Sequence, residues 1–272
     1  MGFGEMPSGE GALNKIEKVT EENWSELKNV QVGEERLEKL LEEGGDEEKM
    51  SQCIYTMLTT RSGFVEEREK VNSLAKMMKP FEKQYAWYDK AREEVEKNIR
   101  EGDKFGCGSN VGWFGVNARP GPKEKEGNDT KIYATIPADE YSFVQNILSL
   151  ANDLREIADE TDDSVQVKFP KGLAEFLAHN DSIVIHFKDK NNVEKIQGAL
   201  SQWMEKYSIT DAPREMGRTK VAVDSKKGGS FSQLVSDNIA SWLGENSGKY
   251  DNKVLAEMAV KYAIEQSQKS PV

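Results

Sequence analysis

At 272 residues, with 31% charged and 37% hydrophobic residues, the chain has the length and composition of a soluble protein with one large domain or two smaller ones. Its net charge of -11 disfavours non-specific binding to nucleic acid or to anionic membranes. No run of residues approaches the roughly 18 apolar residues of a membrane span, and residues 1–15 lack a signal peptide's basic start and apolar core. We therefore expect a cytoplasmic protein, unless a secretion system recognises its N-terminus and delivers it into a host cell.

The first hundred residues are predicted to be helical. One helix ends at Gly44 and Gly45, a second covers residues 47–59, and a third covers residues 64–99 with an interruption at Pro80. Methionine and aromatic side chains recur along the third helix at three- and four-residue spacing, which is typical of a packed helical seam.

The composition changes between residues 101 and 129, where seven glycines and two prolines exclude a continuous helix. We place a boundary here, between a helical N-terminal region (residues 1–103) and an α+β domain (residues 104–272). The order predicted for the second part is strand, helix, strand, strand, helix, strand, helix, helix, after a short strand near residues 111–116. This order predicts an α+β fold with a mixed, mostly antiparallel sheet and helices packed on one side.

The sequence offers no metal or nucleotide motif. Its two cysteines stand apart, its two histidines lack ligand spacing, and no phosphate-binding glycine loop is present. We therefore expect no cofactor, no metal and no nucleic-acid partner.

Four polar residues lie on predicted strands of the α+β part. Lys131 and Tyr133 share one face of the strand KIYATIP, Lys168 stands between apolar residues in VQVKF, and His186 stands near the end of DSIVIHF. Each is also typical of a solvated sheet face. If the strands are neighbours, the four side chains converge on one face of the sheet.

Six short sequence segments of this region together match a known pattern. They are GWFGVNARPGP, KIYATIP, VQVKFP, HNDSIVIHF, MGRTKVAVD and SFSQLVSDNIASWL, and together they span about residues 105–245. The set resembles the HopA-type effector family of plant-pathogen type III secretion, whose domain also occurs as the lyase-like component of class V lanthipeptide biosynthesis. This resemblance implies the same α+β fold, and a protein that either modifies peptides or acts as an effector.

More distantly, KIYATIP and VQVKF resemble two active-site strands of the phosphothreonine lyases, which remove phosphate by elimination without a cofactor. The resemblance implies that Lys168 is the base and Lys131 the accompanying lysine. Tyr133 stands where that family has its acidic histidine.

β-Elimination from phosphoserine or phosphothreonine needs a neutral amine near the Cα–H, cations around the phosphate and a proton donor for the leaving oxygen. A lysine base must have its pKa lowered from about 10.4 by desolvation or by nearby cations. His186 is a candidate replacement for the missing acid, although a histidine satisfied within the core is the alternative. Arg214 and Arg218 are candidate phosphate ligands or, alternatively, solvated loop charges.

Two functions follow. The first is a lyase acting on a phosphorylated peptide or protein. The second is a non-catalytic interaction protein that keeps the lyase-like sheet as a scaffold and binds a protein partner through its helical part.

Overall fold

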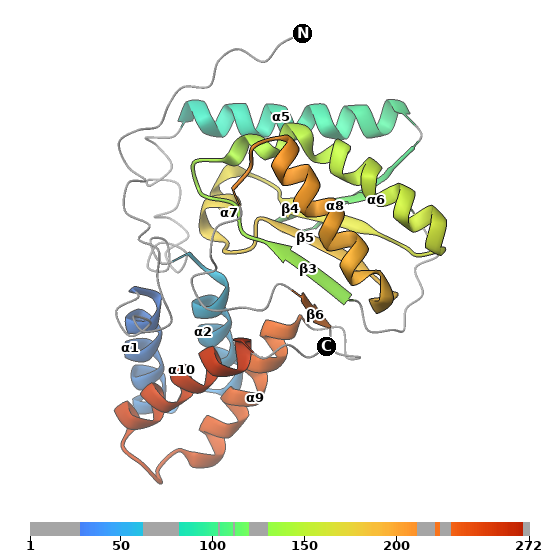
Figure 1. Cartoon of the computed structure of the whole chain (residues 1–272). Coiled ribbons are helices and arrows are strands. Elements are labelled where there is room, and N and C mark those ends of the chain that lie inside the picture. The colour runs from blue at the N-terminus through green and yellow to red at the C-terminus, as the bar shows by residue number, and fades with distance from the viewer. Residues whose placement is uncertain are drawn as a thin grey trace.

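The computed structural model describes residues 28–61, 82–102, 104–110, 112–119, 130–210, 221–223 and 230–268. Its helices and strands form two groups, a sheet layered with helices and a separate bundle of four helices (Figure 1). The predicted α+β class is confirmed.

The sheet has six strands in the order β1-β2-β4-β5-β3-β6. Every neighbouring pair is antiparallel. The strands are β1 (Gly106–Asn110), β2 (Trp113–Asn117), β3 (Thr130–Ala134), β4 (Gln166–Pro170), β5 (Ile183–Phe187) and β6 (Val221–Val223). Because β5 lies between β4 and β3, the two lysine-bearing strands are not direct neighbours.

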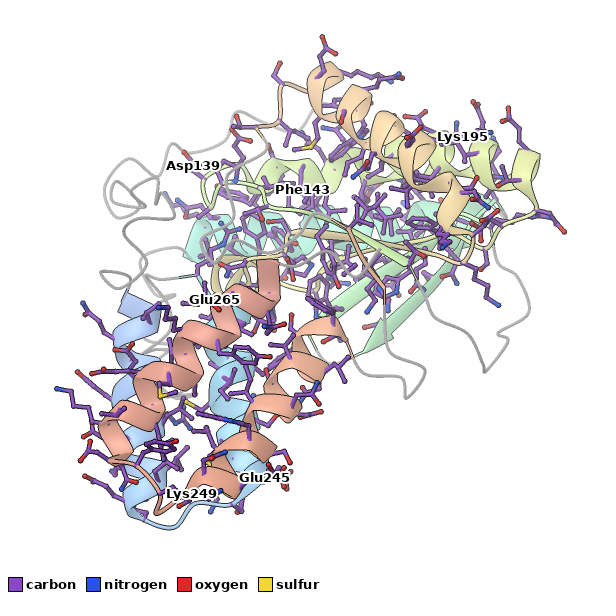
Figure 2. All side chains as sticks on the ribbon, turned by 60° about the horizontal axis from the view of Figure 1, so that its bottom comes forward. Asp139, Phe143, Lys195, Glu245, Lys249 and Glu265 are labelled. Atoms are coloured by element: carbon purple, nitrogen blue, oxygen red, sulfur yellow. The ribbon has the colours of Figure 1, made fainter. Side chains whose placement is uncertain are left out.

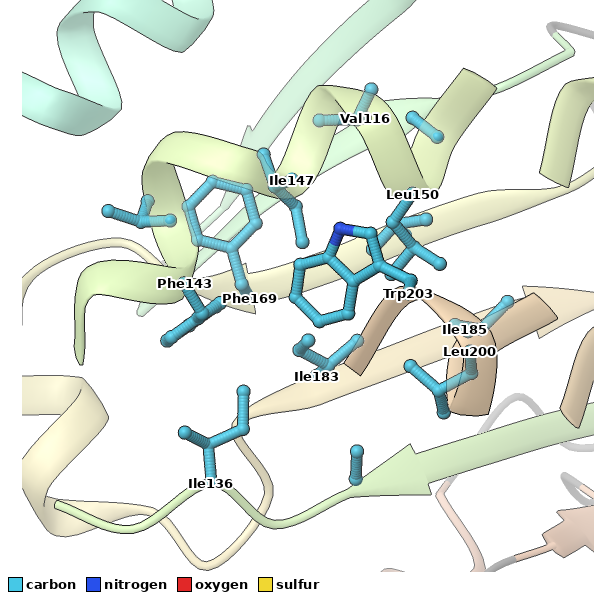
Figure 3. Close-up of a cluster of buried hydrophobic side chains, with 14 of the residues drawn as sticks. Val116, Ile136, Phe143, Ile147, Leu150, Phe169, Ile183, Ile185, Leu200 and Trp203 are labelled. Atoms are coloured by element: carbon cyan, nitrogen blue, oxygen red, sulfur yellow. The ribbon is translucent and has the colours of Figure 1, made fainter. Parts of the chain in front are cut away.

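One face of the sheet is covered by helices. These are α5 (Glu82–Gly102), η4 (Tyr141–Asn146), α6 (Ile147–Thr161), α7 (Leu173–Ala178) and α8 (Val193–Lys206). Alternate strand residues such as Val116, Val167 and Ile185 point into the core beneath them. Trp203 of α8 is buried among these side chains (Figure 3). Its indole N–H donates to the carbonyl of Asn146 at 3.0 Å.

The helix predicted between the strands KIYATIP and VQVKF is in fact two elements. Its first six residues, η4, form two turns of 3-10 helix, and α6 follows directly. Tyr141, Val144 and Ile147 are all buried, and their three-residue spacing matches the three residues per turn of a 3-10 helix.

The second group is a four-helix bundle made from both ends of the described chain. It contains α1 (Lys28–Glu42), α2 (Glu47–Thr59), α9 (Phe231–Asn246) and α10 (Asn252–Gln268). Figure 2 shows these helices as one group, with Glu245 and Lys249 at the end far from Phe143 in the sheet layer. Side-chain caps begin two of these helices, since Asp46 accepts from the amide of Lys49 and Ser230 from that of Gln233.

Each of the two hydrophobic cores contains residues from both sides of the boundary expected near residue 103. Helix α5, from the N-terminal side, packs into the core of the sheet, whereas α9 and α10, from the C-terminal side, complete the bundle with α1 and α2. The division at residue 103 stays a prediction about domains. Residues 64–80 of the long helix expected there lie outside the described residues.

A buried arginine joins the bundle to the sheet layer. Arg61 follows α2 and is only 3% exposed. Its guanidinium donates to the carbonyl of Ile136 at 2.7 Å, to the carbonyl of Phe176 at 3.3 Å and to the hydroxyl of Ser182 at 3.0 Å. The preceding residue, Thr60, pairs with His179 in an isolated antiparallel bridge. These contacts fix the end of α2 against the sheet.

Candidate site on the sheet face

The strand register brings all four predicted polar residues to the face opposite the helices of the layer. Lys131 of β3 lies opposite His186 of β5. Tyr133 and Lys168 both lie opposite Val184, from the two sides of β5. Since Val184 and His186 are two residues apart on one strand, these side chains all point to the same face.

The register also sets the spacing within the group. Directly opposed residues in an antiparallel pair have Cα atoms about 4.5–5.5 Å apart, and diagonal neighbours about 7–8 Å apart. Lys131 and His186 are of the first kind, and Lys168 and His186 are of the second. His186 is therefore the member that stands near both lysines.

The four residues differ in exposure. Lys131 and Tyr133 are buried, with exposed fractions of 7% and 8%, whereas Lys168 and His186 are half-buried. Lys168 and His186 are thus the two that a ligand from solvent meets first. Partial burial also strengthens their electrostatic interactions relative to those in water.

An apolar cluster occupies the same face. Tyr133, Val184 and Ala222 are buried together, and the half-buried Trp113 and Phe231 pack against them. Phe231 is the first residue of α9, so the bundle contacts this face of the sheet. Within this cluster the ring of Tyr133 is part of the packing. Its place in the candidate site, at the position of the family's acidic histidine, stays a prediction.

Two amide side chains extend the polar part of the face. Gln166 lies opposite His186 on one side and Asn117 on the other, and its amide N–H donates to the Asn117 side-chain oxygen. We did not single out these residues from the sequence. The alternation within VQVKF could have identified Gln166, because this residue is two positions from Lys168 and therefore lies on the same face of the strand.

His179 follows α7, and its ring centre is 5.2 Å from that of Trp113, which packs against the apolar cluster of the site face. Arg214 and Arg218, the candidate phosphate ligands, lie outside the described residues. Within the described ranges no three histidine, cysteine or acidic side chains gather in a way that would hold a metal ion. None of the helices described there combines the length and apolar character that a bilayer span requires.

Comparison with known proteins gives little further guidance. No protein-family model and no functionally curated protein matches the chain. Among solved structures, an effector protein from Pseudomonas syringae pv. syringae strain 61 is similar at 12% identity and a TM-score of 0.47, over 89% of this chain and 98% of that one. At that score the likeness carries no argument about function. The narrower resemblance to HopA-type effectors and lanthipeptide lyases stays a prediction.

Proposed function

We propose that this sheet face binds phosphorylated serine or threonine in a peptide or protein and removes the phosphate by β-elimination. The observation that carries the proposal is the register, which gathers Lys131, Lys168 and His186 around one apolar centre. The ammonium of Lys131 and the imidazolium of His186 supply positive charge for a phosphate dianion, and a partly dry surrounding strengthens that attraction.

The reaction assigns one step to each polar residue. The neutral amine of Lys168 takes the proton from the substrate Cα, and that electron pair forms the Cα–Cβ double bond. The Cβ–O bond breaks, and the imidazolium of His186 gives its proton to the leaving oxygen. The products are a dehydroamino acid residue and hydrogen phosphate, and Lys131 stabilises the negative charge on the leaving group. No water is consumed, which distinguishes the reaction from hydrolysis.

Binding is the first test of this proposal. A fluorescent phosphothreonine peptide should bind the wild-type protein, and its unphosphorylated form should not, as measured by fluorescence anisotropy. Lys168→Ala should weaken binding at least about tenfold, since a charge-assisted hydrogen bond contributes roughly 1.5–3 kcal/mol. Lys171→Ala is the matched control, because Lys171 is exposed just after the end of β4 and should leave binding unchanged. Equal binding of both peptides, or equal loss in both variants, would count against the site.

A non-catalytic interaction protein is the second candidate, and one observation favours it. Large apolar side chains are exposed along α10 and just before it, at four-residue spacing: Tyr250, Val254, Met258 and Tyr262. Such a row is typical of a surface that contacts another protein. A chain that neither binds nor changes phosphorylated peptides would favour this second function.

A further inference from the structure

Helix α10 and the turn before it carry a row of large apolar side chains that are open to solvent. This apolar row consists of Tyr250, Val254, Met258 and Tyr262, which are between 43% and 55% exposed. Residues four apart lie on one side of a helix, so these side chains form one continuous strip. The opposite side of α10 is buried in the core of the bundle, and the apolar row is therefore the side that the bundle leaves uncovered.

A row of alternating charges lies beside the apolar row. This charged row consists of four exposed residues, Lys253, Glu257, Lys261 and Glu265. Read in the opposite direction, its order of charges is inverted, because Lys-Glu-Lys-Glu becomes Glu-Lys-Glu-Lys. A second copy of α10 that lies antiparallel therefore places a lysine beside each glutamate, whereas a parallel copy in register places like charges together.

One two-fold axis satisfies both rows. This axis crosses α10 at right angles just after Met258. It brings Val254 level with Tyr262 of the second copy to within one residue, about 1.5 Å along the helix. It brings Lys253 level with Glu265 of the second copy to the same margin. Since rotation about this axis keeps the two charged rows side by side, the apolar rows face each other and unlike charges meet along their border.

The surroundings of Glu257 have an excess of negative charge. Burial, the largest cause, raises the pKa of Glu34 in α1; Glu257 adds to the rise, and Lys253 opposes it. Glu34 and Glu257 are therefore close enough to repel each other. A lysine that a second copy places beside Glu257 would offset this repulsion.

We propose that α10 is a self-association surface on which a second copy of the chain binds antiparallel, with apolar row against apolar row and lysine beside glutamate. Four half-exposed side chains cover less than the roughly 800 Å² that each partner buries in a standard interface, so the dimer should be weak and should depend on protein concentration. The surface belongs to the bundle, and the proposal does not depend on the reaction at the sheet face.

Sedimentation equilibrium of the full chain, over about a hundredfold range of concentration, tests for the dimer. The wild-type protein should shift from monomer to dimer as its concentration rises. Met258→Glu places two carboxylates near the two-fold axis and should leave only monomer. Leu234→Glu is the matched control, because it adds the same charge at an exposed apolar residue of α9, away from both rows, and should leave the dimer unchanged. Thermal unfolding midpoints check that both variants are folded.

A charge exchange tests the antiparallel arrangement. Glu257→Lys and Lys261→Glu each place like charges together twice in a dimer, and each should weaken association at least about fivefold. An equal mixture of these two variants should associate as tightly as wild type to within about twofold, because each variant then supplies the charge that the other lacks.

A wild-type chain that stays monomeric at every concentration, including one that binds a different protein through the apolar row, overturns the inference. A dimer that persists in Met258→Glu, or that is lost equally in Leu234→Glu, overturns the assignment of the surface to α10. A mixture of the two charge variants that associates no better than either alone overturns the antiparallel arrangement.

Discussion

At the scale of single residues, the like-charged pair Asp89 and Glu175 lies away from the site and affects stability. Both carboxylates point towards Gly172, where a β-carbon would be 2.8 Å from an oxygen of Glu175 and 3.7 Å from one of Asp89. Burial, the largest cause, raises the pKa of Asp89; Arg92 opposes the rise, and Glu93 and Glu175 add to it. The ionised form of Asp89 is therefore less stable in the folded protein than in the unfolded chain.

This shift predicts how stability depends on pH. Protonated Asp89 favours the folded state. Its contribution to the free energy of unfolding is fully present below the ordinary pKa of 3.8 and is lost as the pH rises through the higher pKa of Asp89 in the folded protein. At pH 7, Asp89→Asn should raise the free energy of unfolding by about 0.3–0.5 kcal/mol, a small amount because solvent screens this partly exposed group. Well below the ordinary pKa of 3.8 the gain should vanish, because Asp89 is then protonated in both the folded and the unfolded state.

Urea unfolding at pH 7 and at about pH 3 measures the gain in free energy of unfolding under the two conditions. Glu94→Gln, on the exposed side of the same helix, is the control and should change stability little at either pH. A gain that is equal at the two pH values would show that charge is not its cause.

Alternation along single strands predicted which side chains share a face, and it did so for Lys131, Tyr133, Lys168 and His186. It did not predict which residues are neighbours. Chain order would set β3 beside β4, yet β5 lies between them, so Lys131 is next to His186 and not next to Lys168. Strand order depends on how helices pack over the opposite face, and no local pattern contains that information.

At the scale of elements, Asp163 holds the turn between β5 and α8. This buried carboxylate accepts the backbone N–H of Lys188 at 3.0 Å, that of Asp189 at 3.1 Å and the side-chain N–H of Asn192 at 3.0 Å. Both of its oxygens are used. The turn that follows the His186 strand is thus fastened to the end of α6.

Replacing Asp163 by asparagine turns one acceptor into a donor that faces N–H groups. We expect the free energy of unfolding to fall by about 2–3 kcal/mol, since buried donors then lack a partner. Hydrogen exchange at the amides of Lys188 and Asp189 should accelerate as the turn opens more often. The control Asp162→Asn concerns a carboxylate that is 90% exposed, whose ion pair with Arg119 contributes little. Equal effects of the two substitutions would contradict this assignment.

Most elements could be predicted from hydrophobic periodicity, including α2, α8, α9 and the strands β3, β4 and β5. The strand β1 could not, because GCGSN carries no apolar alternation and becomes a strand by pairing with β2. The short helix α7 was also missed, since its six residues contain too few turns for a periodic pattern.

At the scale of the whole molecule, two hydrophobic cores meet beside the candidate site. The bundle reaches the site face through Phe231 at the start of α9, and Arg61 fastens the end of α2 to the carbonyl of Ile136, close after β3. Periodicity showed that α1, α2, α9 and α10 each have an apolar side, but it does not say which helices share a core. The bundle therefore supports the same face that carries Lys168, so substitutions in the bundle should be checked for their effect on the site.

The most direct measurement of the central claim is the mass of a phosphothreonine peptide after incubation with the protein. Elimination predicts a loss of about 98 Da, the mass of phosphoric acid, and Lys168→Ala should slow it at least about 100-fold while Lys171→Ala leaves it unchanged. A peptide of unchanged mass that had bound the protein, or one that had lost about 80 Da by hydrolysis, would contradict the proposed reaction.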